Sequence, residues 1–171
     1  STDAERIALH KLAETFVFTS QGVPFIFAGD EVMRDKKGVH NSYNSPDSIN
    51  TIEWKNKAAY KEVFNYMKDL IALRKSHPAF RMGDAKLVRQ NVHFLPVEEG
   101  VVAYALNGEA VGDSWKTIVV VINSQTRTAQ VTLPEGTYRF ACVNGECPYY
   151  GERIAKETVR VAPQSAVILY Q

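Results

Sequence analysis

The feature that most constrains the fold is an apolar run in Gly22–Glu31, where Val23-Pro24-Phe25-Ile26-Phe27-Ala28 ends abruptly in Gly29-Asp30-Glu31. The run does not alternate with polar residues, so both of its faces should be buried, as in a parallel strand within an α/β layer. Pro24 stands near its start, where a strand tolerates a missing N–H. A long polar loop follows as far as Trp54. A loop of this length after a buried parallel strand favours a functional role.

Two helices are predicted around this strand. The first runs from about Thr2 to Thr19, because Thr2 and Glu5 have the spacing of a capping box. Its apolar face consists of Ile7, Leu9, Leu12, Ala13, Phe16 and Val17. The second runs from about Lys57 to Ser76, with Asn56 as its cap, and stops before Pro78. Its buried side consists of Ala59, Tyr60, Val63, Phe64, Met67, Leu70 and Ile71.

From about Lys86 the hydrophobic period changes to two, and turn residues punctuate the chain. Strands are predicted at Lys86–Gln90, Val92–Leu95, Val101–Leu106, Thr117–Ile122, Thr128–Leu133, Thr137–Val143, Thr158–Val161 and Ala166–Tyr170. Several short strands with regular turns indicate an antiparallel β-sandwich, in which Thr117–Ile122 should be central because it is apolar on both sides. The domain boundary is placed near Ala79–Asp84, which gives domains of residues 1–80 and 81–171.

The first domain lacks neighbours for its strand. A strand with two apolar faces needs a strand on each side, and these residues supply no second parallel strand. We therefore expect the first half to be the last part of a larger α/β layer, with Ser1 as a cut inside a longer chain.

Composition excludes some classes of function. The formal net charge is +1 without a basic block, so nucleic-acid binding has no electrostatic support. No apolar run approaches the roughly 18 residues of a membrane helix, so we expect no membrane span. The cell compartment, cytoplasmic or extracytoplasmic, stays open. Cys142 and Cys147 flank an Asn-Gly turn, and a short disulfide and two free thiols are equally good interpretations.

The residues also resemble a known family. Gln21–Glu31 resembles the eighth barrel strand of the α-amylase superfamily. Lys37–Asn50, followed by Trp54, narrows the resemblance to type I pullulanases, which hydrolyse α-1,6 links in pullulan and branched α-glucans. Ile71–Arg81 is similar to their last barrel helix and its exit, and the β-rich remainder is similar to their C-terminal domain.

The resemblance implies an α/β plus all-β chain: the last βα portion of a (β/α)8 TIM barrel, then an antiparallel β-sandwich. The family uses an Asp nucleophile, a Glu acid/base and a second Asp, all on strands that precede this chain, so no catalytic residue is assigned here. The implied partners are an α-glucan (pullulan, starch or glycogen) and the remainder of the barrel. A non-catalytic carbohydrate-binding or structural β-sandwich is the alternative.

The polar loop supplies the candidate substrate contacts. Asn side chains both donate and accept hydrogen bonds, Asp only accepts, and aromatic rings stack on sugar rings. The candidates are Asn41, Tyr43, Asn44, Asp47, Asn50 and Trp54, with Asn44 and Asp47 as first choices. A simpler interpretation is that the Asn, Ser and Pro residues of the loop only build turns. Arg34, Lys36 and Lys37, just before the loop, are interpreted as a solvated surface.

Other clusters are weaker candidates. Neighbouring residues of an extended chain point to opposite sides, so Asp30 and Glu31 are expected to hold the loop through backbone hydrogen bonds rather than to form a catalytic pair. No cofactor is expected, with calcium in the oxygen-rich loop as the one alternative. Tyr104, Trp115, Tyr138, Tyr149 and Tyr150 are the aromatics that a carbohydrate-binding module could expose.

Overall fold

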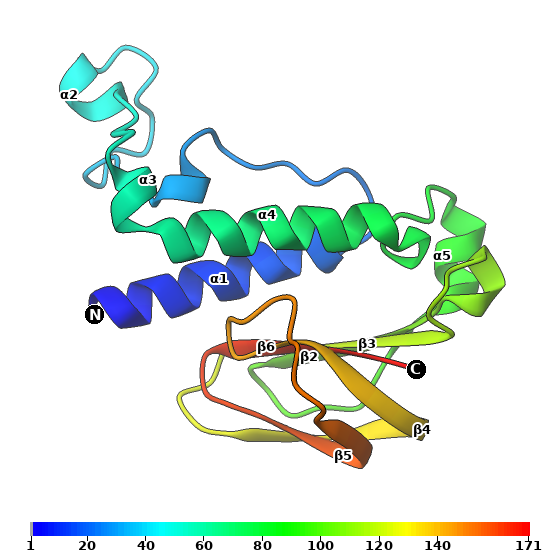
Figure 1. Ribbon diagram of the computed structural model, residues 1–171. Helices are drawn as coiled ribbons and strands as arrows, with labels where there is room; N and C mark the ends of the chain where they lie inside the picture. Colours follow the sequence, from blue (N-terminus) through cyan, green and yellow to red (C-terminus); the bar gives the residue numbers. More distant parts are fainter. Residues whose placement is uncertain (1) are drawn as a thin grey trace.

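A computed structural model describes residues 2–171 as a layer of helices packed on one face of an antiparallel sheet (Figure 1). The helical elements are α1 (Asp3–Thr19), η1 (Asp30–Val32), α2 (Asp47–Asn50), α3 (Asn56–Ala59), α4 (Lys61–Ser76), η2 (Pro78–Phe80), α5 (Ala85–Asn91) and η3 (Glu109–Val111). The strands are β1 (Val92–Phe94), β2 (Val101–Asn107), β3 (Thr117–Asn123), β4 (Ala129–Val143), β5 (Ile154–Val161) and β6 (Ser165–Tyr170). Within these residues, no helix is long and apolar enough to cross a membrane.

The sheet has the strand order β1-β2-β3-β6-β4-β5, and every pairing is antiparallel. β3 lies inside the sheet between β2 and β6, with Val120 opposite Tyr104 on one side and Ile168 on the other. Its residues after Thr117 are all buried. The predicted central strand is therefore confirmed.

The strands form one bent sheet rather than the two sheets of the predicted sandwich. The first half of β4, Ala129–Thr132, pairs only with β5, whereas Arg139–Val143 pairs with β6. Register shifts between Thr132 and Thr137 and between Phe140 and Cys142 bend this long strand. Because β4 stays hydrogen-bonded on both sides of the bend, one continuous sheet curls around a second core. Figure 1 shows β4 and β5 turning away below the other strands.

The main core lies between the sheet and the helices. Its buried side chains come from both halves of the chain: Leu12, Phe18, Tyr66, Met67, Leu70, Phe80, Leu106, Ile118, Val120 and Ile168. α1 and α4 run side by side in the same direction above β6 and β3 (Figure 1). The Thr15 hydroxyl lies 2.5 Å from the Tyr66 hydroxyl between them, and that of Thr19 lies 2.6 Å from Tyr104 on the sheet. The division at residues 80 and 81 stays a prediction.

Arg74 fixes the end of α1 against α4. Its guanidinium donates hydrogen bonds to the carbonyls of Phe18 (2.9 Å), Ser20 (2.7 Å) and Gly22 (2.6 Å). These carbonyls would otherwise lack partners at the end of a helix. Burial, and next the charge of Arg81, lower the pKa of Arg74 from its ordinary value.

The first predicted helix is confirmed, including its capping box. The Glu5 amide donates to the Thr2 hydroxyl at 3.2 Å, and the Thr2 amide donates to the Glu5 carboxylate at 2.7 Å. However, only part of its expected apolar face is buried. Leu12 is buried, whereas Leu9 and Phe16 are 39% and 45% exposed.

The second helix differs from the prediction. It is split at Tyr60, whose backbone (φ −111°, ψ 37°) leaves the helical region, into α3 and α4. Asn56 opens α3 as a helical residue, and its side chain does not cap the helix.

The strand predicted at Lys86–Gln90 is wrong, because this segment is helix α5. Asp84 is its N-cap, and one carboxylate oxygen accepts from the amides of Lys86 and Leu87, both at 2.9 Å. The remaining predicted strands are observed, but Thr128–Leu133 and Thr137–Val143 form the single strand β4, and β5 begins at Ile154.

The strand predicted in Gly22–Glu31 is not formed. Residues 23–27 form neither helix nor strand, and Val23 and Phe25 are 93% and 88% exposed. A strand needs a neighbour for its backbone groups, and no segment of residues 2–171 pairs with this one. The burial that the apolar pattern predicted is therefore not observed within residues 2–171.

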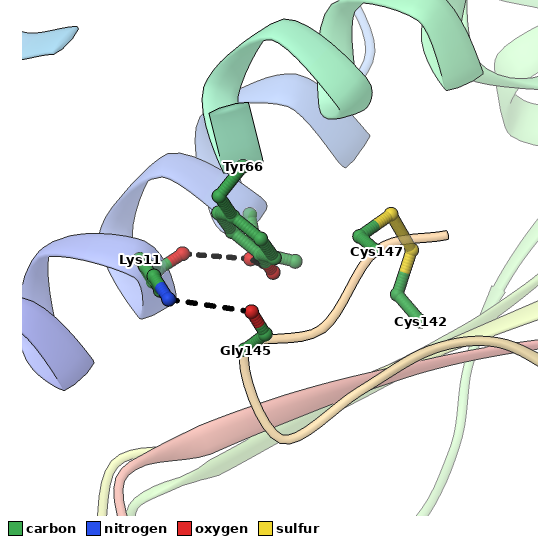
Figure 2. Close-up of a disulfide and its surroundings, with 6 residues drawn as sticks. Lys11, Tyr66, Cys142, Gly145 and Cys147 are labelled. Atoms are coloured by element: carbon green, nitrogen blue, oxygen red, sulfur yellow. Dashed lines mark hydrogen bonds between the residues drawn. A yellow bond between two sulfur atoms is a disulfide. The ribbon is translucent and has the colours of Figure 1, made fainter. Parts of the chain in front are cut away.

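Cys142 and Cys147 form a disulfide, which decides between the two interpretations of the sequence. It closes the turn after β4, where the amides and carbonyls of Val143 and Glu146 exchange two hydrogen bonds of 2.9 Å. Figure 2 shows Lys11 of α1 reaching the Gly145 carbonyl of this turn, a contact of 3.4 Å.

The Asp113 carboxylate, whose side chain is fully buried, joins the end of α4 to the start of β3. It contacts His77 Nδ1 at 2.7 Å and accepts from the amides of Ala79 (3.0 Å) and Trp115 (2.9 Å). We predict that Asp113→Ala lowers the free energy of unfolding by about 3 kcal/mol, because three partly buried donors lose their acceptor. Urea unfolding followed by circular dichroism measures the change.

The matched control is Glu135→Ala, which removes an exposed carboxylate from β4. It should change the same free energy by less than about 0.5 kcal/mol. Equal stabilities of the Asp113 and Glu135 variants would contradict the role given to Asp113.

Candidate functional site

The predicted substrate loop lies between η1 and α3 and stands apart from the sheet, with α2 at its tip (Figure 1). The Asn50 side chain holds it in shape by donating to the carbonyls of Ser42 (2.7 Å) and Ser45 (2.9 Å). Asn50 is half-buried, so its place in the structure is that of a loop brace. Both hydrogens of its side-chain amide are used in these bonds, so only Oδ1 is left for the predicted contact with substrate.

Basic side chains hold the base of the loop. Arg34 donates to the carbonyls of Ala28 (3.0 Å) and Asn50, and Lys36 donates to the Ser42 hydroxyl. The interpretation of Arg34 and Lys36 as merely solvated charges is therefore wrong. Gly29 has φ 102°, and a Cβ there would lie 2.7 Å from Arg34 Cδ, so the position requires glycine.

The other predicted contact residues point outward. Asn41, Tyr43, Asn44, Asp47 and Trp54 are all exposed, and within residues 2–171 none of their side chains forms a hydrogen bond. Tyr43 is 84% and Trp54 64% exposed. Side chains whose only role was to brace the loop would form hydrogen bonds within it, and these five do not.

The structure does not bring these residues into one pocket. Asp47 lines a polar hollow of about 260 Å³ with Arg34 and Lys37. Trp54 lines a different hollow of about 340 Å³ against Lys61 and Phe64. The loop therefore offers two separate contact surfaces.

Asp30 and Glu31 hold the backbone of this turn, which confirms the prediction from the sequence. The Phe27 amide donates to the Asp30 carboxylate at 2.9 Å, and the Gly29 amide donates to the Glu31 carboxylate at 3.0 Å. His10 Nε2 lies 2.9 Å from the Asp30 carbonyl, which ties this turn to α1.

Sequence reasoning missed Glu14, a buried carboxyl on α1. It is 6% exposed, Oε2 has no hydrogen-bond partner, and Oε1 lies 3.7 Å from His10 Nε2. Burial, and next the charges of Asp30 and Glu31, raise the pKa of Glu14 from 4.5 to about 7. The signal available in the sequence was its position four residues after His10, which places both side chains on one side of the helix.

Metal binding gains no support from the side chains. Within residues 2–171, no group of three or more His, Cys, Asp and Glu side chains is placed to hold a metal ion. His77 has a structural role, since it pairs with Asp113 and the centroid of its ring lies 3.6 Å from that of Trp115.

Comparisons by sequence agree on one group of enzymes. A family model described as "Pullulanase, all-beta domain" matches residues 88–146. The pullulanase of Bacillus subtilis (strain 168) is 37% identical over 169 residues, which cover 98% of this chain and 23% of that protein. The isoamylase of Flavobacterium sp is 28% identical over 151 residues, or 77% of this chain and 19% of that protein.

Solved structures agree with these relatives. The pullulanase from Bacillus acidopullulyticus matches 100% of this chain and 21% of its own, with a TM-score of 0.93 and 39% identity. The pullulanase complexed with maltotetraose from Anoxybacillus sp. LM18-11 matches 100% of this chain and 24% of its own, with a TM-score of 0.89 and 34% identity. The chain thus spans about a quarter of the length of these relatives.

Pullulanases and isoamylases are debranching glycoside hydrolases, and the chain is similar to one part of such enzymes. Within the class the chain belongs to the pullulanases, whose C-terminal region it matches. The resemblance derived from the sequence is therefore confirmed.

Glu14 generates a prediction on pH. Because its pKa in the folded chain is about 7, above the ordinary value of 4.5, its favourable contribution is complete below pH 4.5 and is lost as pH rises through 7. We predict that Glu14→Gln raises the melting temperature relative to the unaltered chain at about pH 8 and leaves it little changed at about pH 4.

Differential scanning calorimetry across this range measures the difference. The control is Glu135→Gln, an exposed carboxylate, which should follow the unaltered chain at every pH. A Glu14→Gln curve parallel to that of the unaltered chain would show that Glu14 does not titrate as described.

Proposed function

We propose that the chain is part of a pullulanase-type debranching enzyme that hydrolyses α-1,6-glucosidic links in pullulan, starch or glycogen. The observation that carries the proposal is the match to the C-terminal region of pullulanases along nearly the whole chain, at 37% identity by sequence and a TM-score of 0.93 by fold. Solved relatives are complexed with maltotriose and maltotetraose, which supports an α-glucan as the partner.

The helical half fits the end of a (β/α)8 barrel in the parent enzyme. In such a barrel, successive helices run in the same direction on the outside of the strands, as α1 and α4 do here (Figure 1). Residues 23–28 would then be the strand between them. Its exposed apolar side chains, Val23, Phe25 and Phe27, would be covered by the preceding strands.

Two further features support a missing neighbour. Leu9 and Phe16 on α1 expose an apolar stripe that the sheet does not cover. An apolar hollow of about 460 Å³ lies between Ile26 and Phe27 on one side and Phe64 and Ile71 on the other. A monomeric domain rarely leaves such surfaces open, so the remainder of the barrel is the proposed partner.

Chemistry in the parent would take place on carboxylates outside these residues. By resemblance to the family these are an Asp nucleophile, a Glu acid/base and a second Asp. We propose retaining hydrolysis, in which the Asp forms a glycosyl-enzyme intermediate that water then opens. Asp30 and Glu31 do not replace this pair, because their carboxylates are occupied by backbone amides.

The loop would supply contacts on the substrate side. Tyr43 and Trp54 offer free aromatic faces, and Asn41, Asn44 and Asp47 offer free polar groups for sugar hydroxyls. These five side chains fit a glucan that lies across the loop and reaches both hollows.

Asp47 provides the test of the loop. In the enzyme that contains this chain, we predict that Asp47→Ala lowers kcat/KM on pullulan by about tenfold to a hundredfold, since a charged hydrogen bond to a substrate hydroxyl is worth about 1.5–3 kcal/mol. The melting temperature should fall by no more than a few degrees, because Asp47 is exposed and its side chain has no partner within residues 2–171.

The control for this variant is Glu99→Ala, which removes an exposed carboxylate from the turn between β1 and β2. It should keep both kcat/KM and the melting temperature. Unchanged kinetics of Asp47→Ala would remove Asp47 from the proposed contacts.

We also predict that the 171-residue chain alone does not hydrolyse pullulan, because the proposed catalytic carboxylates lie outside it. A reducing-sugar assay on protein from two independent purification schemes measures this. Turnover that copurifies with the chain in both schemes would refute the assignment of the chemistry.

A further inference from the structure

We propose a second α-glucan site, in a pocket between the end of α4, the end of β6 and residues 146–150. It would bind one end of a neutral glucan through Tyr150 and Tyr170, with Asp69 and Glu146 accepting hydrogen bonds from sugar hydroxyls. The choice of an α-glucan rests on the proposed function, but the pocket itself does not depend on the Asn41–Trp54 loop.

The pocket has the size of a ligand site. Its volume is about 510 Å³, larger than the hollows of about 260 and 340 Å³ beside the loop. Pockets for small ligands usually measure about 300–1,000 Å³.

Aromatic rings form two of its walls. Tyr150 is 87% exposed at the rim, an unusual state for a tyrosine that would serve only to pack. Tyr170 stacks on Trp115, with ring centroids 4.0 Å apart and an interplanar angle of 14°, and His77 stacks on Trp115 at 3.6 Å. Two parallel rings so close to Trp115 must cover opposite faces of it. Trp115 therefore fixes Tyr170 in place and offers no free face of its own.

The polar groups of the pocket favour a neutral ligand rich in hydroxyls. Asp69 and Glu146 line it, and within residues 2–171 neither side chain has a hydrogen-bond partner. Carboxylates only accept hydrogen bonds, which sugar hydroxyls donate. Among the described residues no Lys or Arg lines the pocket, and His77 is engaged by Asp113 at 2.7 Å. An anionic ligand would thus meet two carboxylates and no free cation.

The wall that carries Tyr150 is held before any ligand arrives. The Cys142–Cys147 disulfide closes the preceding turn, and Cys147 itself lines the pocket. The Tyr149 amide then donates to the Ala141 carbonyl at 2.7 Å, and its ring meets Phe140 edge-on. A wall that is already ordered loses little conformational entropy on binding.

The other two aromatics that the sequence offered for such a site do not contribute. Tyr104 and Tyr138 are 5% and 0% exposed and belong to the two cores. Of the five candidates, the structure brings only Trp115, Tyr149 and Tyr150 to this pocket.

The test is isothermal titration of the 171-residue chain with maltoheptaose, a linear neutral α-glucan. We expect saturable binding that weakens about tenfold in Tyr150→Ala, since loss of an aromatic face costs up to about 1.5 kcal/mol. Tyr150→Phe should restore affinity to within about twofold, because the ring face remains. Phe94→Ala, which removes another aromatic side chain that is 75% exposed, should match the unaltered chain.

Each of the following results would overturn the site. Absence of maltoheptaose binding would do so, as would equal affinity of Tyr150→Ala and the unaltered chain. Binding of tetramethylammonium in place of maltoheptaose would assign the two carboxylates and the tyrosines to a cation. A Tyr43→Ala arm separates the two proposals: loss of binding there, with Tyr150→Ala unaffected, would support the loop and reject this pocket.

Discussion

The fold depends on the contact between one face of the sheet and the helices α1 and α4. Buried side chains from Leu12 to Ile168 meet in this layer, so the helices bury their apolar side chains against the sheet, whereas the sheet also encloses a second core made only of its own half of the chain. Polar groups fix its geometry: Arg74 gathers the carbonyls at the end of α1, and Asp113 joins the end of α4 to the sheet. Both the loop and the pocket at Tyr150 take their positions from these same helices.

Local signals in the sequence predicted most elements of this layer. The capping box at Thr2 and the two-sided apolar pattern of Thr117–Ile122 depend only on nearby residues, and both are observed. Lys86–Gln90 was misjudged because the Asp84 cap decides for a helix over a short alternating pattern. The run at Gly22–Glu31 could not be placed, since its burial depends on neighbours outside the described residues. Likewise, no local pattern says whether strands join in one sheet or two.

The candidate site was likewise predictable where the signal is local, and not where it depends on contacts between distant residues. The polar loop was visible in the sequence, and five of its six candidate residues are free to meet a ligand. The sixth, Asn50, also braces two carbonyls that only the folded loop brings together, a role that the sequence did not show. Glu14 escaped notice since a carboxylate on a helix usually faces water. The pocket at Tyr150 combines residues from α4, β6 and the turn after β4, which are distant in sequence.

The divided surface of α1 has a consequence for the evolution of the chain. Leu12 and Phe18 pack inward, while Leu9 and Phe16 lie on another side, so the helix carries two apolar stripes with different destinations. One residue inserted or deleted near its middle would rotate the following turns by about 100°. That change would bring the wrong stripe to the sheet and misdirect the other. Descendants of this sequence can exchange side chains along α1, but length variation should be confined to the connections at its ends.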